Sequence, residues 1–335
     1  MDANQPPARM RVLIIRYGTT GDILLTTPII RAIHQQIDGA EIHYLLNRKY
    51  QGVLETNPYI AKIHSFKNGI SEKTDELKAE NFDFIIDLQY NKKTKNLCKH
   101  LGLPCSFVKR HPFRHWMCVR LKINTLPQKH HVERYFEAVE AISVHNDYQG
   151  LEYYIPEERT FDTDTLPVFF EDGFVAVILE ANRVTQRIPI SKIVEISTIL
   201  HKPIVLLGGK NVESLGKEIV SQLGDRAFNI CGQLTFDQTA SIISKSACVL
   251  TGDTDLMHLA VAMHKPICSL WGSTVPEFGK YPYMPNERSM FRIFEVCSLK
   301  CRPCARAGFK KCPRRHFRCM NKISAMEVAD WINQF

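Results

Sequence analysis

Two short segments of this 335-residue chain place an aspartate beside glycine, directly after an apolar run. In the first, Gly18 and Gly21 lead to Asp22; in the second, Gly252 precedes Asp253 and Thr254. Glycine allows a tight turn and a close approach of the backbone to a ligand. A carboxylate held in such a turn can act as a general base. A helix that begins there offers free N–H groups to a diphosphate.

Structural interpretations of the same residues stay open. Asp22 could cap the helix that follows it. His258 lies four residues after Thr254 and so on the same helix face, where a cap and a buried histidine explain the pair as well as a ligand would. Residues 18–22 lack the lysine of a P-loop and the third glycine of a dinucleotide fingerprint, so neither of those nucleotide sites fits.

Two weaker patterns point to the same kind of ligand. Gly208 and Gly209 end an apolar run, and Glu213 follows at a place where an acid commonly binds ribose hydroxyls. Residues 180–189 (EANRVTQRIP), which include Asn182, carry Arg183 and Arg187, whose charge could neutralise a diphosphate. Alone, neither pattern is specific, because surface arginines and glycine turns are common.

The elements that must position these residues alternate along the chain. Apolar runs rich in Val and Ile at residues 11–17, 41–46, 61–66 and 82–88 predict strands, and residues 23–37 predict one helix. A second alternation begins near residue 174, after an irregular linker at 151–173. Alternating strands and helices predict an α/β protein with parallel sheets. We expect two Rossmann-like domains, residues 1–165 and 166–335.

Charge and cysteine content suggest further partners. The net charge is +8, with nine Lys or Arg and no acid in residues 91–122, and nine more, again without an acid, in residues 300–322. These are solvated faces, or they attract a phosphorylated glycolipid, a membrane surface or nucleic acid. A Cys/His cluster near the C-terminus offers a structural zinc site or a loop of reduced thiols. Its members are Cys297, Cys301, Cys304, Cys312, His316 and Cys319.

Localisation follows from what the sequence lacks. No run approaches the roughly 18 apolar residues of a membrane-spanning helix. Residues 1–10 contain two prolines and no apolar segment, so we expect no signal peptide. The chain is therefore expected in the cytoplasm, either free or peripheral at the cytoplasmic face of the inner membrane.

Taken in order, these segments resemble the bacterial ADP-heptose:lipopolysaccharide heptosyltransferases, glycosyltransferase family 9. The resemblance spans nearly the whole chain, from RYGTTGDILLTTPIIRAI at residues 16–33 through LLGGKNVE to the terminal cysteine pattern. It implies a GT-B fold, in which two Rossmann-like domains face a cleft. It also implies inverting transfer of a sugar, usually from ADP-heptose, to a lipopolysaccharide inner core, with no catalytic metal.

The resemblance assigns roles residue by residue. Asp22 matches the catalytic base, and Asp253, Thr254 and His258 match a D-[ST]-G-x-x-H donor motif. Glu213 is the expected ribose contact, and Gly208, Gly209, Asn182, Arg183 and Arg187 complete the donor side. An anionic glycolipid is the expected acceptor, and nucleic acid is not. The residues expected to bind that acceptor are Thr19, Thr20, Gln89, Lys92, Lys95 and Arg110.

Two positions depart from the family pattern, both on the donor side. Asp255 stands where the family has glycine, which puts a carboxylate near the expected diphosphate. Gln186 stands where the family has lysine in its K-x-W-P segment. These departures keep two alternatives open: a degenerate GT-B protein that binds a nucleotide sugar without transferring it, and a sugar-nucleotide epimerase.

Overall fold

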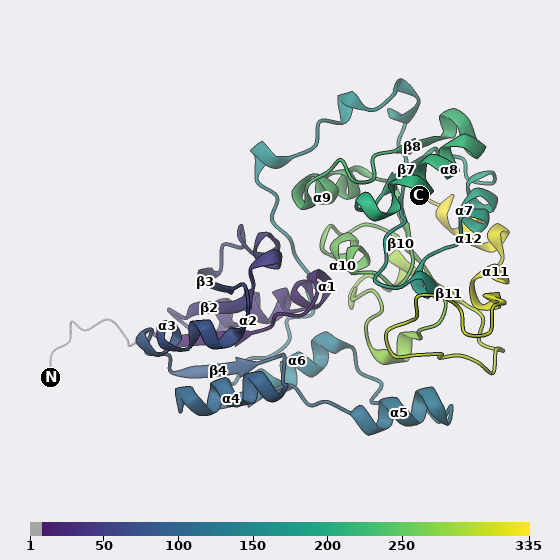
Figure 1. Cartoon of the computed structure of the whole chain (residues 1–335). Coiled ribbons are helices and arrows are strands. Elements are labelled where there is room, and N and C mark those ends of the chain that lie inside the picture. Colours follow the sequence, from purple (N-terminus) through teal and green to yellow (C-terminus); the bar gives the residue numbers. More distant parts are fainter. Residues whose placement is uncertain (1–8) are drawn as a thin grey trace, which may run out of the picture. The chain divides into compact units, whose positions relative to one another are not determined.

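A computed structural model describes residues 9–335. Residues 1–8, in which no signal peptide is expected, lie outside this range. The chain forms two compact units (Figure 1). Unit 1 holds the chain up to Arg110 together with Lys129–Tyr154, and unit 2 holds His111–Gln128 together with Ile155–Phe335. This division differs from the predicted boundary after residue 165, because the chain enters unit 2, returns to unit 1 and leaves it again at Tyr154.

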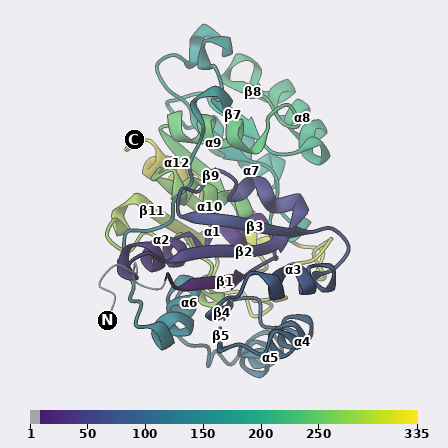
Figure 2. The same ribbon diagram turned by 90° about the vertical axis from the view of Figure 1, so that its left-hand side faces the viewer.

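Unit 1 is a parallel five-stranded sheet flanked by helices (Figure 2). Its strand order is β3-β2-β1-β4-β5, and β1 pairs with β2 from Arg11↔Glu41 to Ile15↔Leu45. Val12–Ile15 are all buried, as expected of a strand covered on both faces. The strands are β1 (Arg11–Ile15), β2 (Glu41–Asn47), β3 (Ile60–Phe66), β4 (Phe84–Asp87) and β5 (Cys105–Phe107). The helices are α1 (Thr20–Leu24), α2 (Thr27–Gln36), α3 (Thr74–Ala79), α4 (Lys92–Leu101) and α6 (His131–Val139).

The single helix predicted over residues 23–37 is wrong, because the structure has two helices there. α1 ends at Leu24, and α2 begins at Thr27 with Pro28 in its first turn. Proline lacks an N–H and clashes with the preceding turn, so it starts a helix well and interrupts one badly. The break leaves α1 as a five-residue helix that carries Asp22 in its first turn.

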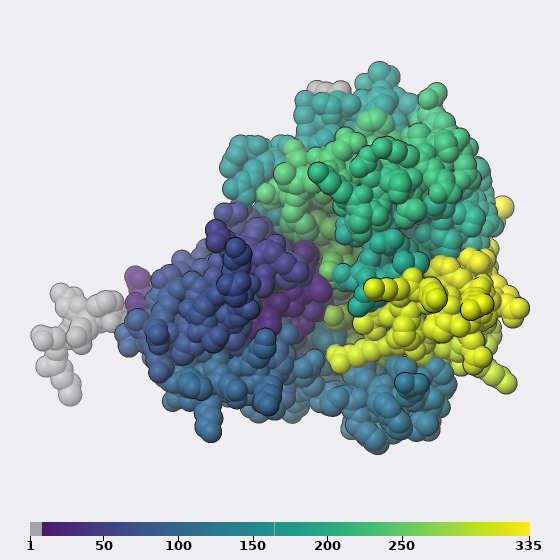
Figure 3. Space-filling view, in the orientation of Figure 1, coloured from purple at the N-terminus to yellow at the C-terminus, as the bar shows by residue number. Residues whose placement is uncertain are grey.

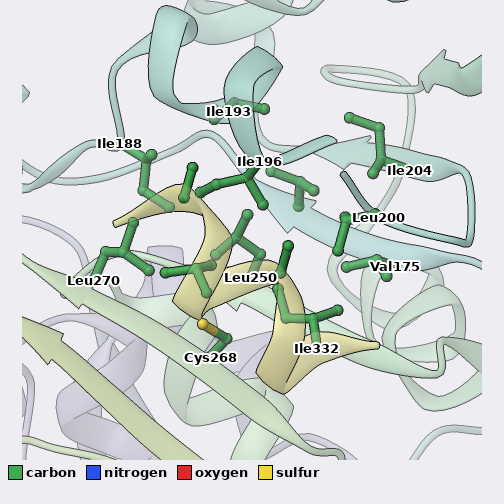
Figure 4. Close-up of a cluster of buried hydrophobic side chains, with 14 of the residues drawn as sticks. Val175, Ile188, Ile193, Ile196, Leu200, Ile204, Leu250, Cys268, Leu270 and Ile332 are labelled. Carbon is green, nitrogen blue, oxygen red and sulfur yellow. The ribbon is translucent and has the colours of Figure 1, made fainter. Parts of the chain in front are cut away.

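Unit 2 is a parallel six-stranded sheet of order β11-β10-β9-β6-β7-β8. Its main apolar cluster lies where α7 and α12 cover the sheet, with Ile193 and Ile196 against Leu250 and Leu270 (Figure 4). The strands are β6 (Val175–Ile178), β7 (Ile204–Leu207), β8 (Ala227–Asn229), β9 (Cys248–Thr251), β10 (Ile267–Trp271) and β11 (Phe291–Glu295). The helices are α5 (Pro112–Arg120), α7 (Ile190–Ser197), α8 (Glu213–Leu223), α9 (Phe236–Lys245), α10 (Asp255–Ala262), α11 (Arg318–Asn321) and α12 (Ala325–Ile332).

Helix α5 belongs to unit 2 although it lies between two elements of unit 1 in the chain. Cys118 and Leu126 pack with Val275 and Phe278 in a small apolar cluster. The Nζ atom of Lys122 donates to the carbonyl oxygen of Pro303 at 2.6 Å. In Figure 3 this segment lies against the yellow C-terminal part of the chain. Residues 111–128 are thus an excursion of the chain that unit 2 anchors.

Both sheets have a topological switch point at their first strand. In unit 1 the chain leaves β1 toward β2 and later returns to its other side as β4; in unit 2, β6 lies between β7 and β9. The loops that follow such neighbouring strands diverge, and ligands of open α/β sheets bind in the crevice that results. Among residues 9–335, none of the helices has the length and apolar character that crossing a bilayer requires.

Candidate functional site

The carboxylate of Asp22 is fixed by a buried arginine at the switch point of unit 1. Arg16 follows β1, and its Nη2 atom lies 2.7 Å from Asp22 Oδ2. Both side chains are about one-tenth exposed, at 11% each. Burial opposes the charge of Arg16, but the neighbouring Asp22 carboxylate raises the pKa of the guanidinium well above its usual value. Arg16 therefore stays charged and holds the Asp22 carboxylate in one position.

The turn before Asp22 is packed closely around that carboxylate. Thr19 caps α1 by accepting a hydrogen bond from the Asp22 N–H, and Asp22 Oδ2 lies 3.4 Å from the Thr19 nitrogen. A Cβ atom at Gly18 would lie 2.4 Å from Asp22 Oδ2. Asp22 is therefore both part of a capping box and an ion-pair partner, so the cap and base interpretations do not exclude each other. Its role as a base stays a prediction.

Gln89, which is predicted to bind the acceptor substrate, follows β4 and contacts this turn, because β4 lies beside β1 in the sheet. Its Oε1 accepts a hydrogen bond from the Tyr17 N–H at 3.3 Å, and Arg16 donates to the carbonyl of Leu88 at 2.9 Å. The backbone after β4 is itself fixed by Asp87, whose Oδ1 accepts from the Gln89 and Tyr90 N–H groups. The loops after β1 and β4 are thus in contact, which brings Thr19, Thr20 and Gln89 to one edge of the sheet.

An aromatic pair with cations beside it lies at the same end of the sheet, after β4 and at the end of β5. Tyr90 stacks on Phe107, with ring centroids 4.4 Å apart and planes 4° from parallel. The Lys95 ammonium lies 4.1 Å from the Tyr90 ring centroid, and Arg110 donates to the Tyr90 carbonyl at 3.0 Å. Lys92, at the start of α4, is exposed. Predicted acceptor residues Lys95 and Arg110 therefore gather around an aromatic stack that the sequence alone did not indicate.

In unit 2, Asp253 is tied into a buried network. Its Oδ2 atom accepts hydrogen bonds from Gln186 Nε2 and Thr274 Oγ1, both at 2.7 Å. Burial raises the pKa of Asp253, against the effect of the hydrogen bonds from Thr274 and Gln186. The lysine that the family has at position 186 would meet this carboxylate with a charge, whereas Gln186 meets it with a neutral amide. The predicted donor role of Asp253 stays a prediction, and its contacts join the loops after β6, β9 and β10.

The other members of the predicted donor motif lie at the start of α10. Thr254 is its N-cap, accepting from the Met257 N–H at 3.2 Å, and His258 is buried one turn later. Asp255, which replaces the family glycine, accepts from Asn182 Nδ2 at 3.2 Å. That bond connects the loops after β6 and β9 across the switch point of unit 2.

The two-glycine segment after β7 is held by a residue that sequence reasoning missed. Glu180 Oε2 accepts a hydrogen bond from the Gly209 N–H at 2.9 Å. A Cβ atom at Gly208, whose φ is +155°, would lie 2.5 Å from Val212. Glu213, the predicted ribose contact, begins α8 and pairs with Lys217 at 2.7 Å, and this hydrogen bond lowers its pKa. Its ionised carboxylate is accessible to solvent.

Cations near these loops differ in what holds them. Within residues 9–335, neither Arg183 nor Arg187 is paired with a carboxylate. Arg302, by contrast, is buried and donates to the carbonyls of Gly272 and Thr274 at 2.6 and 3.0 Å. Arg183 and Arg187 remain available to an anionic ligand, whereas Arg302 braces the loop after β10.

The C-terminal cysteines lie near one another without forming a compact ligand set. Cys301 Sγ is 3.9 Å from His316 Nε2, and Cys304 Sγ donates to the Cys301 carbonyl. Burial raises the pKa of Cys304 and of Cys319 to about 11, so both are thiols at neutral pH. Among the described residues, the ligand atoms of Cys301, Cys304, Cys312 and Cys319 do not come within 4.8 Å of one another as a group of three. Structural zinc at this cluster stays a prediction.

The raised pKa of Asp253 predicts a dependence of stability on pH. Between the unfolded value of about 3.9 and the higher folded value, the folded state binds more protons, so stability falls as pH rises. Asp253→Asn removes this dependence. Urea unfolding at a series of pH values from about 4 to about 7 should therefore favour the variant over wild type increasingly as pH rises. The exposed Asp225→Asn is the control. A difference that stays constant with pH would contradict the burial of a proton-binding Asp253.

Comparison with known proteins identifies the family. A family model described as glycosyltransferase family 9 (heptosyltransferase) matches residues 72–315. Lipopolysaccharide heptosyltransferase 3 of Escherichia coli is 22% identical over 315 residues, which cover 83% of this chain and 91% of that protein. Lipooligosaccharide heptosyltransferase 2 of Haemophilus influenzae is 26% identical over 116 residues, one third (33%) of each chain.

Solved structures show the same fold. A glycosyl transferase family 9 protein from Veillonella parvula superposes with a TM-score of 0.75 at 19% identity, covering 97% of this chain and 98% of that one. E. coli heptosyltransferase WaaC with ADP gives a TM-score of 0.69 at 18% identity, covering 97% and 99%. These likenesses and the two parallel sheets confirm the predicted α/β fold of the GT-B class. The family match covers well over half of the sequence, and the chain belongs to glycosyltransferase family 9 (heptosyltransferase).

Proposed function

We propose that this chain transfers heptose from ADP-heptose to an anionic lipopolysaccharide inner-core acceptor, with inversion at the anomeric carbon. The observation that carries the proposal is the Asp22 carboxylate, fixed by buried Arg16 at the switch point of unit 1. Relatives named for this activity support the donor and acceptor classes. The reaction as proposed uses no metal and takes place in the cytoplasm.

The chemistry is one displacement. An acceptor hydroxyl oxygen attacks the anomeric carbon while Asp22 takes its proton. The bond from that carbon to the diphosphate oxygen breaks on the opposite face, and ADP leaves with the electron pair. Arg16 holds the Asp22 carboxylate in orientation until it takes the proton, since a carboxylate that swings away from the hydroxyl loses the proton-transfer geometry.

The donor is assigned to unit 2. Within residues 9–335, Arg183 and Arg187 on the loop after β6 are not paired with a carboxylate, and the N-terminus of α10 adds the positive end of its helix dipole for the diphosphate. Glu213 is an exposed carboxylate for ribose hydroxyls. Asp255 is the unfavourable charge here, and its hydrogen bond from Asn182 holds one of its oxygens.

The acceptor is assigned to unit 1. Lys92, Lys95 and Arg110 supply positive charge for phosphate or carboxylate groups of an inner core, and the Tyr90–Phe107 stack supplies an apolar face for a sugar ring. Thr19, Thr20 and Gln89 lie at the edge that carries Asp22. Together these groups match a glycolipid that is both anionic and rich in rings.

Replacing Asp22 tests the base directly. Asp22→Asn should fold, bind ADP with unchanged affinity and lose about 10²–10⁴-fold in kcat, because the amide cannot take the proton. Exposed Asp38→Asn is the matched control. Gly18→Ala should lose rate in the same way, since its Cβ would overlap Asp22 Oδ2, whereas Gly52→Ala, with nothing within 4 Å, should not.

The outcomes separate the alternatives. Full turnover by Asp22→Asn would remove Asp22 as the base. Conversion of ADP-heptose without any acceptor would indicate an epimerase. Calorimetry that shows donor binding but no transfer by wild type with any inner-core acceptor would indicate a degenerate binding protein. Calorimetry with UDP- and GDP-sugars as well tests whether Asp255 and Gln186 have changed which nucleotide sugar the chain binds.

Charge reversal tests the acceptor side. The triple variant Lys92→Glu, Lys93→Glu, Lys95→Glu should raise the acceptor KM by roughly tenfold or more at low salt, with a smaller effect at high salt, because screening weakens exposed charge attraction. The KM for ADP-heptose should not change. A control with the same change in charge is Lys67→Glu, Lys78→Glu, Lys129→Glu. An acceptor KM equal to that of the control would make α4 a merely solvated face.

Helix α5 supplies a surface for the expected membrane contact. Phe113 and Trp116 are 67% and 51% exposed and stack on each other at 5.9 Å, and Leu121 and Ile123 are also more than half exposed. Arg114, Arg120 and Lys122 lie among them, with no acid in residues 91–122. Exposed aromatic and aliphatic side chains beside cations are typical of segments that lie in the interface of an anionic bilayer. This surface, residues 111–124, would hold the enzyme near a lipid-linked acceptor.

Vesicle binding tests this surface. Phe113→Ser with Trp116→Ser should reduce co-sedimentation with phosphatidylglycerol-containing vesicles by about tenfold, with ADP binding unchanged. Val168→Ser with Phe169→Ser, which removes two other exposed apolar side chains, is the control. Equal loss in both variants, or no loss in either, would remove α5 as the contact.

A further inference from the structure

Two buried histidines and three glutamates form a cluster in unit 1 that the proposed reaction does not use. His43 lies in β2 and His64 in the neighbouring edge strand β3, and their exposures are 2% and 0%. His43 Nδ1 is 3.0 Å from His64 Nε2. The two residues share one face of the sheet through a diagonal pairing, since His43 pairs with Lys62 and His64 with Leu45. A register shift between Ile42 and His43 lies at this point, and such irregularities often re-aim a side chain at a functional position.

In each histidine ring, the nitrogen that faces away from the other histidine, called the outer nitrogen, contacts a carboxylate. His43 Nε2 is 3.0 Å from Glu41 Oε1, and His64 Nδ1 is 2.6 Å from Glu76 Oε1. The other oxygen of each carboxylate is paired with a cation, since Arg11 Nε lies 3.1 Å from Glu41 Oε2 and Lys73 Nζ lies 2.6 Å from Glu76 Oε2. An ionised carboxylate can only accept, so both outer nitrogens must carry hydrogen.

With both outer nitrogens protonated, no hydrogen remains for the contact between the two inner nitrogens, His43 Nδ1 and His64 Nε2. Glu41–His43–His64–Glu76 has three contacts at hydrogen-bond distance, and each needs one hydrogen. Two neutral imidazoles carry two, and both are used at the outer nitrogens. The inner nitrogens would therefore face each other as two lone pairs 3.0 Å apart. A cation between the rings, either a third proton or a metal ion, removes this repulsion.

A third ligand reaches the same point. Glu80, which follows α3, has Oε2 3.9 Å from His43 Nδ1, and one ligand atom from each of His43, His64 and Glu80 lies within 4.8 Å of the others. Its second oxygen is paired with Lys62, a half-exposed lysine that can turn into solvent. The ring of Phe82 packs edge-on against both histidines and closes the apolar side.

We propose that His43, His64 and Glu80 form a binding site for a zinc-class divalent metal ion, with Glu41 and Glu76 orienting the two histidines. Two imidazoles and one carboxylate are a ligand set that zinc accepts, with water in the fourth position. Carboxylates on the outer nitrogens of metal-bound histidines are the usual second layer of such sites. Tetrahedral zinc needs ligand nitrogens about 3.3 Å apart, a small widening of the contact present here.

The ion would act on the structure of unit 1 rather than on transfer. It would join β2, the edge strand β3 and the residue that follows α3. β3 pairs with a neighbouring strand on one side only. A metal clamp at this edge is independent of Asp22 and of the donor loops, so it is separate from the proposed function.

The test must separate this site from the C-terminal cysteines. We would use the full chain with Cys301→Ser and Cys304→Ser, treated with chelator, and titrate it with Zn²⁺ by calorimetry with elemental analysis. One zinc per chain is expected, with a rise in Tm of roughly 5–10 °C at saturation. His64→Gln should lose at least about 100-fold in affinity and Glu41→Gln about 10–100-fold, whereas exposed His100→Gln should match the parent.

Two further readouts keep the result decisive. If His64→Gln does not fold, Glu80→Gln and Glu41→Gln at the more exposed rim replace it. Co²⁺ in the same protein should give a visible d–d spectrum without a thiolate charge-transfer band. Absence of zinc binding, binding that His64→Gln or Glu80→Gln leaves unchanged, or ¹⁵N spectra in which a protonated histidine pair persists at saturating zinc would overturn the metal site in favour of a shared proton.

Discussion

The ion pair between Arg16 and Asp22 is the interaction on which the arrangement of the loops after β1 and β4 depends. It places a charged pair at the end of the central strand, where each side chain is only 11% exposed. Removing either partner would leave the other charge buried and uncompensated, which is costly. Gly18 is required beside it because a Cβ there would occupy the place of the carboxylate. Arg16 also holds the Leu88 carbonyl, so one guanidinium fixes the loops on both sides of the switch point.

Unit 2 also buries a carboxylate, that of Asp253, but its hydrogen-bond partners are neutral side chains. Asp253 accepts hydrogen bonds from an amide and a hydroxyl, and burial raises its pKa against these bonds and the charge of Lys280. Gln186, at the position where the resemblance implies a lysine, therefore gives this buried carboxylate a neutral partner. The proposed diphosphate site keeps two cations, because within residues 9–335 Arg183 and Arg187 are not paired with a carboxylate. The second departure, Asp255, is matched by Asn182 across the same pair of strands.

Much of this arrangement could be predicted from sequence, because periodicity and glycine positions report local structure. Most strands, the parallel class and the loops that carry Asp22 and Asp253 follow from apolar runs and turns, but the edge strands β5 and β11 were not predicted. The split of the first long helix depended on Pro28, whose effect outweighed the apolar spacing. The packing of residues 111–128 into unit 2 was not predictable, because Cys118 and Leu126 meet partners more than 140 residues away.

Partners at long range explain the other omissions too. No local sequence pattern indicates that Glu180 contacts Gly209, that Tyr90 contacts Phe107, or that His43 contacts His64. Each pair joins neighbouring strands or loops whose register is set by the sheet. The sequence identified the residues that end strands, but only the strand order shows which of them meet.

We propose that the donor nucleotide binds at the loops after β6, β7 and β9 of unit 2. Hydrogen–deuterium exchange of the full chain with and without saturating ADP tests that assignment most directly. We expect slower exchange in peptides that cover residues 180–187, 208–213 and 252–258, with unit 1 unchanged at residues 11–24. Protection confined to unit 1, or bound ADP with no change in these three loops, would contradict it.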